Sequence, residues 1–138
     1  DHRRIGAQIT HADDRETTGQ LLTALKALAQ AAPELPRAPR VDVPEPSELR
    51  LAQAMLPRDA FFGPAENVPL AEAAGRITAE MITPYPPGIP AILPGERLNE
   101  PVLSYLRTGL EAGMNLPDPT DPQLDTIRVV AVGGASTE

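Results

Sequence analysis

The stretch RITAEMITPYPPGIP, residues 76–90, decides the architecture that this sequence predicts. Its first half alternates, with Ile77, Ala79 and Met81 on one side of an extended chain and a charged residue on the other, which is typical of a strand. Its second half holds four prolines in seven residues. Each proline fixes φ and has no N–H to donate to a sheet. The stretch therefore predicts a strand that runs into a rigid turn, with little backbone entropy left to lose on folding.

The strand and the turn together present a candidate site. Its members are the acid in the strand and the residues at the tip of the turn, namely Glu80, Tyr85, Pro86, Pro87 and Gly88. Gly88 supplies a backbone conformation that other residues resist. A carboxylate held in place here would favour the cationic end of a ligand. The alternative is structural: the acid pairs with Arg76, Arg97 or backbone N–H groups, and the turn is only a tight corner.

Elsewhere the chain predicts short elements separated by proline-rich connections. Leucines at helical spacing predict a helix over residues 15–31 that begins after two aspartates and is ended by Pro33. A second helix is expected between Asn99, as the N-cap, and Gly113, as the C-terminal stop. Shorter elements are expected as strands at residues 5–9, 89–93 and 127–132, and as helices or helical turns at residues 48–55, 57–62 and 69–75. The fold class that follows is α+β, with a small mixed sheet and several short helices.

The composition excludes several classes of function. Twelve Lys+Arg against 19 Asp+Glu give a net charge of −7, which argues against the clustered positive charge of a nucleic-acid-binding protein. The chain has no cysteine, and its acids near His11 are better explained as a helix start, so no metal site is expected. No apolar run approaches the roughly 18 residues of a membrane span, and no signal peptide is visible, so we expect a cytoplasmic protein. Because the first residue is Asp1 rather than Met, we expect a fragment or a processed product.

Three segments of the chain resemble the ornithine/lysine/arginine decarboxylases, and the shorter bacterial members of that family match best. The C-terminal domain of the family has a signature similar to GRITAEMITPYPPGIPAILPGE, residues 75–96. The segments LPRDAFFGPAENVPLAEA, residues 56–73, and LDTIRVV, residues 124–130, also resemble the family and stand in the expected order. The long proline pattern makes the resemblance specific.

The resemblance implies three parts and an activity. Residues 1–32 would be the last strand and helix of the small domain of a pyridoxal-phosphate enzyme fold, residues 33–46 a proline-rich linker, and residues 47–138 the decarboxylase C-terminal domain. The implied enzyme is a lyase of polyamine biosynthesis, which converts ornithine, lysine or arginine to a diamine or agmatine plus CO₂. The implied partners are the chain's own catalytic domain, a second subunit in a homodimer or higher assembly, and a cationic amino acid substrate.

The resemblance places pyridoxal phosphate in the full-length enzyme and not on this chain. The family's cofactor lysine lies in a Ser-x-His-Lys motif that has no match here, and the one lysine of this chain, Lys26, is predicted to be solvated on a helix. We therefore assign no catalytic or cofactor-binding residue and expect the fragment alone to be inactive. The segment with Glu80 and Tyr85 is expected at an active-site entrance or a subunit contact. The alternative function is an independent acidic module that binds a partner protein through its proline-rich strap.

Overall fold

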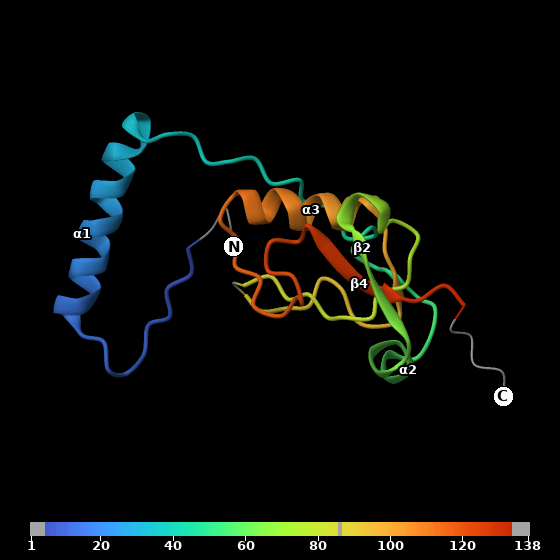
Figure 1. The fold of residues 1–138 in the computed structure, drawn as a ribbon. Helices are drawn as coiled ribbons and strands as arrows, with labels where there is room; N and C mark the ends of the chain where they lie inside the picture. The colour runs from blue at the N-terminus through green and yellow to red at the C-terminus, as the bar shows by residue number, and fades with distance from the viewer. Residues whose placement is uncertain (1–4, 86, 134–138) are drawn as a thin grey trace. The chain divides into compact units, whose positions relative to one another are not determined.

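The computed structural model describes residues 5–85 and 87–133, which form two compact units. One unit lies within Arg3–Ala38 and the other within Pro39–Glu138. Figure 1 shows the helices and strands of both units.

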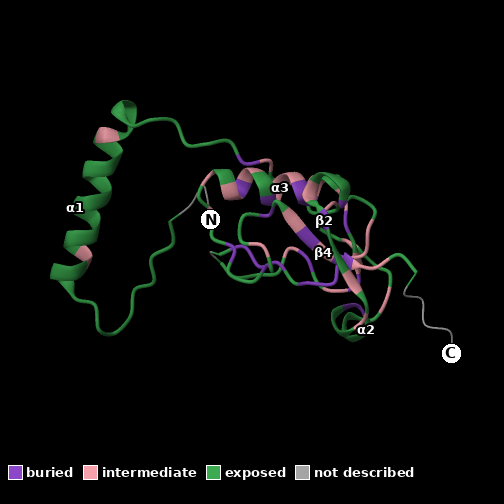
Figure 2. Ribbon diagram, viewed as in Figure 1, coloured by how far each residue is buried: buried purple, intermediate pink, exposed green. Residues whose placement is uncertain are grey.

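The first unit contains one long helix, α1, over Arg15–Ala31, as predicted. The helix begins at Asp14, whose side chain accepts hydrogen bonds from the backbone N–H groups of Glu16 and Thr17, and the Thr17 hydroxyl accepts one from the Asp14 N–H in return. These bonds satisfy N–H groups that a helix start otherwise leaves unpaired. No residue of α1 is buried (Figure 2), and its leucine stripe is exposed.

Residues 5–9 differ from the sequence prediction, because the structure gives them no strand pairing. A strand satisfies its backbone groups through a neighbouring strand, and the described part of this unit provides none. A one-turn 3₁₀ helix, Ala32–Glu34, follows α1, and an extended segment leads from it toward the second unit.

The second unit is an α+β domain that contains two small antiparallel sheets. In one sheet β1 (Ala52–Gln53) pairs with β3 (Glu96–Arg97). In the other, β2 (Ala65–Pro69) pairs with β4 (Thr126–Val130) along the whole length of both strands. The predicted fold class is confirmed. The predicted single mixed sheet is wrong, since the described strands form two separate antiparallel pairs.

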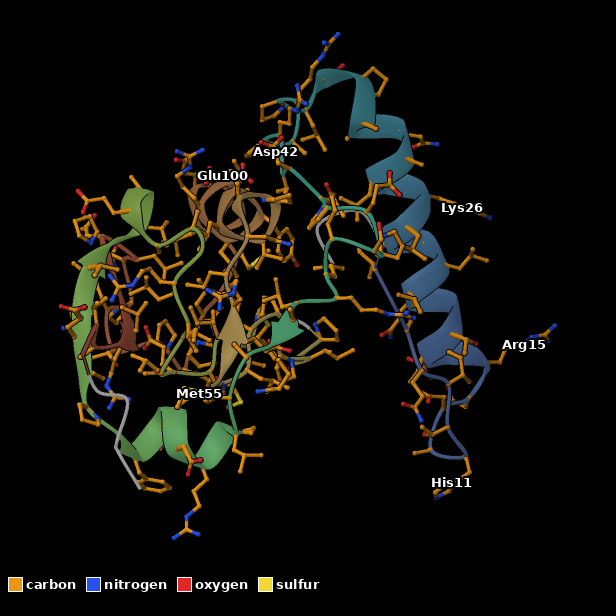
Figure 3. All side chains as sticks on the ribbon, turned by 90° about the vertical axis from the view of Figure 1, so that its right-hand side faces the viewer. His11, Arg15, Lys26, Asp42, Met55 and Glu100 are labelled. Atoms are coloured by element: carbon orange, nitrogen blue, oxygen red, sulfur yellow. The ribbon has the colours of Figure 1, made fainter. Side chains whose placement is uncertain are left out.

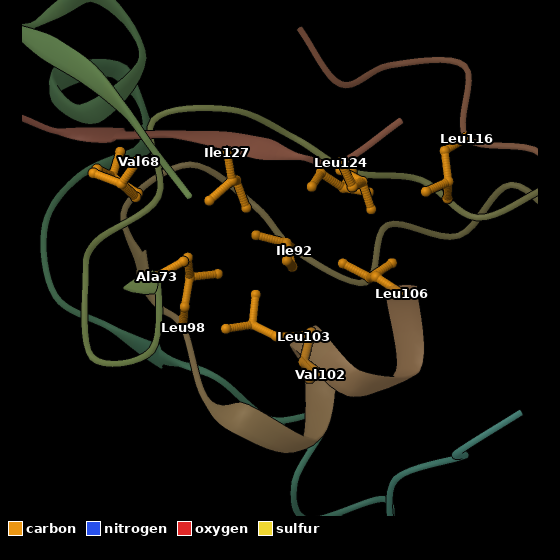
Figure 4. Packing of buried hydrophobic residues seen from close by; sticks show 12 residues of the cluster. Val68, Ala73, Ile92, Leu98, Val102, Leu103, Leu106, Leu116, Leu124 and Ile127 are labelled. Carbon is orange, nitrogen blue, oxygen red and sulfur yellow. The ribbon is translucent and has the colours of Figure 1, made fainter. Parts of the chain in front are cut away.

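Helix α3, Glu100–Glu111, provides one wall of the hydrophobic core. It begins at Asn99, whose side chain accepts a hydrogen bond from the Val102 N–H, as the sequence predicts. It ends before Gly113, which has the positive φ of +89° that favours glycine. The core, between α3 and β4 (Figure 4), contains Val68, Ala73, Ile82, Ile92, Leu98, Val102, Leu103, Leu106, Leu116, Leu124, Ile127 and Val129.

Residues 76–83 cross the domain without forming the regular strand that the alternation predicts. Their N–H groups bond to different segments: Thr78 to Glu96, Ala79 to Arg128 and Ile82 to Ile92. Because the segment passes between both sheets, it is buried on two faces rather than one, and residues 78–80 are buried in succession. A segment that is buried on both faces cannot be recognised from an alternation of apolar and polar residues, which indicates burial on one face only.

Two local predictions in the second unit need correction. A helix was expected over residues 48–55, but the structure has a turn at residues 46–49 followed by β1. The backbone of β1 is bonded to β3 instead, so tertiary pairing overrides the local helical spacing. Strand β2 was not predicted, since Ala65–Pro69 carries two prolines nearby and little alternation. Helix α2, Pro57–Phe62, and the 3₁₀ turn Leu70–Glu72 lie where short helical turns were expected.

Candidate functional site

Glu80 lies inside the domain with both carboxylate oxygens bonded to backbone. Its side chain is buried, at 4% exposure. One oxygen accepts a hydrogen bond from the Arg128 N–H at 2.7 Å, and the other accepts one from the Thr120 N–H at 2.8 Å. Hydrogen bonds to an ionised group are among the stronger ones in proteins. Glu80 therefore joins the segment of residues 76–83 to β4 and to the loop that precedes it.

The side chain of Arg128 completes this arrangement from the β4 side. Its guanidinium donates to the carbonyl of Ala79 at 2.7 Å and to the carbonyl of Phe61 at 3.1 Å. It also lies 5.8 Å from the centre of the Phe61 ring, within cation–π range. The backbone just before Glu80, at Ala79, is thus held by the same residue whose N–H binds the carboxylate.

The turn at residues 84–90, which we call the proline turn, lies at the surface. Pro84 is buried, whereas Tyr85 and Ile89 are 56% and 68% exposed. The Tyr85 N–H bonds to the Asn115 carbonyl at 2.9 Å, and the Gly88 N–H closes the turn on the Pro84 carbonyl at 2.9 Å. Gly88 has a φ of +86°, which other residues rarely adopt, as the sequence predicts. The turn is therefore fixed at both ends and presents apolar side chains outward.

Beside the proline turn is a hollow of about 350 Å³, which we call the apolar groove. Its lining comes from the turn, from α3 and from the segment before β1, and comprises Val43, Pro44, Leu49, Pro84, Pro87, Ile89, Pro90, Ala91 and Tyr105. None of these residues carries a charge, and burial raises the pKa of Tyr105, so its phenol stays neutral. The lining suits apolar or aliphatic surface rather than a charged group.

The structure separates the residues that the sequence grouped as one site. Glu80 is in the interior, Tyr85, Pro87 and Gly88 are exposed on the proline turn, and Pro86 lies outside the described residues. Sequence reasoning missed Thr120 as a partner of the acid, because the two are 40 positions apart. It also missed the part of the groove that comes from residues 43–49, although the high proline content there is a signal for an ordered strap.

The described residues contain neither a metal-binding cluster nor a membrane-spanning helix. Across residues 5–85 and 87–133, no group of three or more His, Cys, Asp or Glu side chains has a geometry that could hold a metal ion. In the same ranges, no helix combines the length and the apolar character needed to cross a membrane.

Comparison with known proteins gives a consistent result. A family model described as the C-terminal domain of Orn/Lys/Arg decarboxylases matches residues 46–119. An arginine decarboxylase of Bacillus anthracis is 39% identical over 126 residues, which are 88% of this chain and 24% of that protein. An arginine decarboxylase of Bacillus subtilis (strain 168) is 49% identical over 77 residues, 56% of this chain and 16% of that protein.

Among solved structures, the crystal structure of a Francisella novicida lysine decarboxylase superposes with a TM-score of 0.56. The match covers 87% of this chain and 24% of that one at 22% identity, so it supports the fold alone. The chain thus spans no more than about a quarter of the length of these relatives.

Proposed function

This chain belongs to the family of Orn/Lys/Arg decarboxylase C-terminal domains, and from that premise we propose that it is the C-terminal portion of a basic amino acid decarboxylase. The proposed enzyme uses pyridoxal phosphate to convert ornithine, lysine or arginine to a diamine or agmatine plus CO₂. It would act in polyamine biosynthesis in the cytoplasm, as a homodimer or a higher assembly.

The observation that carries the proposal is the continuity of the family match across the second unit. The matched residues, 46–119, include α3, the whole proline turn and most of the lining of the apolar groove. The relatives with named activities are arginine or lysine decarboxylases. The alternative, an independent module that binds partners through its proline-rich strap, is not favoured by these matches.

The residues of this chain do not fit the cofactor. Pyridoxal phosphate needs a lysine that is held and partly desolvated, with an acid beside the ring nitrogen. Lys26 is exposed on α1, and its side chain extends away from the helix (Figure 3). We therefore place the cofactor and the reacting atoms in the longer protein and derive no chemical step from this chain.

For the domain itself we propose a supporting role at the active-site entrance or at a subunit contact. The exposed face of the proline turn, with Tyr85, Pro87 and Gly88, would contact the chain's own catalytic domain or a second subunit. The uncharged groove beside it would receive apolar side chains from that partner. Glu80 would act indirectly, without contacting the partner, by holding in place the segment that leads into the turn. Both of its carboxylate oxygens are already bonded to backbone N–H groups.

The activity is tested with the longer protein that carries this sequence, supplied with pyridoxal phosphate. Release of CO₂ is measured with arginine, lysine and ornithine in turn, and the present chain alone serves as the inactive control. We expect turnover of at least one of the three substrates by the longer protein only. Absence of turnover with all three would refute the assigned activity.

The supporting role is tested by Ile89→Ser in the longer protein, with Val132→Ser as the matched control. Both positions are exposed aliphatic residues, at 68% and 83%, but only Ile89 lines the groove. We expect Ile89→Ser to weaken subunit association or to lower kcat/KM by about tenfold, which corresponds to one lost apolar contact of about 1.4 kcal/mol. Equal behaviour of the two variants in kinetics and in sedimentation would remove this role from the turn.

A further inference from the structure

A second hollow, of about 380 Å³, lies on the opposite flank of α3 from Tyr105. We call it the charged groove. It runs between α3 and two short segments, one at the end of β2 and one just before β4, and its lining comprises Pro69, Leu70, Ala71, Glu100, Leu103, Ser104, Arg107, Leu110, Glu111, Gln123, Leu124 and Asp125. Its volume lies within the range of about 300–1,000 Å³ that is typical of small-molecule sites.

The charged groove has an apolar floor and a charged rim. Leu103 and Leu124 are buried beneath it, and Leu70 and Leu110 are partly buried. On α3, Glu100, Arg107 and Glu111 are seven and four positions apart, so they share one face of the helix. Arg107 and Glu111 are separated by about 6 Å along the helix axis.

The charged side chains of the rim are not used by the fold. In the part of the chain that the structure describes, Arg76, Arg97 and Arg128 each donate to a backbone carbonyl. No hydrogen bond or ion pair within the same residues involves the guanidinium of Arg107, or the carboxylates of Glu111 and Asp125. Counting Glu100, the rim therefore has one cationic and three acidic side chains, which give it a net charge of −2 around an apolar floor.

The wall opposite α3 is held in place independently of any ligand. The carboxylate of Asp121 accepts hydrogen bonds from the N–H groups of Thr126 at 2.9 Å and Gln123 at 3.0 Å. The carbonyl of Asp125 accepts one from the Leu70 N–H at 3.1 Å, which joins the two segments of the wall. Leu124, which lies between Gln123 and Asp125 in the chain, has a φ of +54°, a conformation that a leucine rarely adopts. The wall therefore presents Asp125 from a backbone that is already ordered.

We propose that the charged groove binds a free basic amino acid. The planar guanidinium of Arg107 matches the α-carboxylate of the ligand, which it can bind through two parallel hydrogen bonds. The methylene chain of the ligand lies on the apolar floor, against the partly buried Leu70 and Leu110, and its cationic end pairs with Asp125 or Glu111. A diamine lacks the carboxylate, and an aliphatic amino acid lacks the distal cation, so each satisfies only half of the rim.

The proposal follows from the lining of the groove, and its ligand class coincides with the substrate class of the proposed function. In the longer protein, such a site would let the concentration of a basic amino acid act on the C-terminal domain itself. The binding step needs neither pyridoxal phosphate nor turnover. The binding test can therefore fail in a protein that has decarboxylase activity, and binding can be found in a protein that lacks this activity.

The test uses this chain alone, titrated with L-arginine, L-lysine and L-ornithine and followed by calorimetry and by amide chemical shifts. We expect saturable binding of at least one of them, with shifts concentrated at residues 100–111 and 123–125. Arg107→Gln and Asp125→Asn should each weaken it by about tenfold or more, the loss expected for one charge-assisted pair. Arg58→Gln and Asp59→Asn, which change the same charges on α2 outside the groove, should leave it unchanged.

Ligand analogues decide the question even if a variant does not fold. Agmatine, which lacks the carboxylate, and norleucine, which lacks the distal cation, should each bind the unaltered chain at least about tenfold more weakly than the best basic amino acid. No saturable binding to the unaltered chain, or equal binding of agmatine and arginine, would overturn the proposal.

Discussion

Replacing Glu80 with Gln should destabilise the second unit strongly, although the two side chains have nearly the same shape. The carboxylate accepts from two backbone N–H groups, those of Thr120 and Arg128. A glutamine amide has one oxygen, so it can accept from one of them, while its NH₂ group faces the other N–H donor to donor. One buried N–H then has no partner, and the remaining bond loses its charge assistance.

The size of the effect follows from these two losses. A buried N–H without a partner costs about 1–3 kcal/mol, and a bond to a charged acceptor is worth about 1 kcal/mol more than a neutral one. We therefore expect the free energy of unfolding to fall by about 2–4 kcal/mol. For a domain of this size, each kcal/mol lowers Tm by roughly 4–8 °C, so Tm should fall by about 8–32 °C.

Thermal unfolding of the unaltered chain, Glu80→Gln and Glu72→Gln provides the measurement. Glu72 is exposed, so its variant controls for the change of one charge. Amide hydrogen exchange at residues 120 and 128 should accelerate in Glu80→Gln alone. A Tm within about 2 °C of the parent, with unchanged exchange at both amides, would refute the anchoring role. Kinetics of the longer protein test the other hypothesis for Glu80, that it contributes to substrate access. That role would raise KM or lower kcat/KM in a Glu80→Gln variant that melts at the same temperature as the parent.

Three further predictions concern the same domain. The backbone N–H groups of Thr126 and Gln123 hold the pKa of Asp121 below the usual 3.8. The contribution of Asp121 to stability is therefore present above pH 3.8 and is lost as the pH falls through its lower folded-state pKa. The Tm difference between the parent and Asp121→Asn should be constant near neutrality and shrink below about pH 3.8. Gly95→Ala should lower the free energy of unfolding in urea by more than about 2 kcal/mol, because φ is +87° and a Cβ would lie 2.4 Å from a backbone carbonyl oxygen. The Cβ of Gly109→Ala would meet only a flexible methionine side chain, so this variant should change stability by about 1 kcal/mol or less. Equal costs for the two variants would contradict this reasoning. Ile92→Ala removes a fully buried core side chain and should cost about 2–5 kcal/mol in the same assay, and a cost below about 1 kcal/mol would be inconsistent with the packing described.

The long helices could be predicted from the sequence because their signals are local. Asp14 and Asn99 cap their helices through bonds that span three residues, and Gly113 ends α3 in its own backbone conformation. Such signals are complete within one turn of the chain. Gly109 is a local signal of the same kind, since a glycine inside a helix is otherwise unfavourable and its position here is close to the Met114 side chain.

The sheets and the candidate site were only partly predictable, because their partners are distant in sequence. β1 becomes a strand through its pairing with Glu96–Arg97, and nothing within residues 48–55 indicates that partner. The backbone partners of Glu80 could not be identified from the sequence, because Thr120 and Arg128 lie 40 and 48 positions away from it. The rigidity of the proline turn was visible in the residues themselves, whereas the groove beside it depends on residues 43–49 and on α3.

The pairing of β2 with β4 also sets the order in which this domain can assemble. β4 supplies Ile127 and Val129 to the core and the Arg128 N–H to Glu80, yet it follows the other described elements of the domain in the sequence and is synthesised after them. Contacts between residues so far apart carry a large loop-closure cost, and such topologies fold slowly. The residues matched by the family model end at 119, seven positions before β4 begins. A polypeptide cut at that boundary would therefore contain the family signature but could not close its own core.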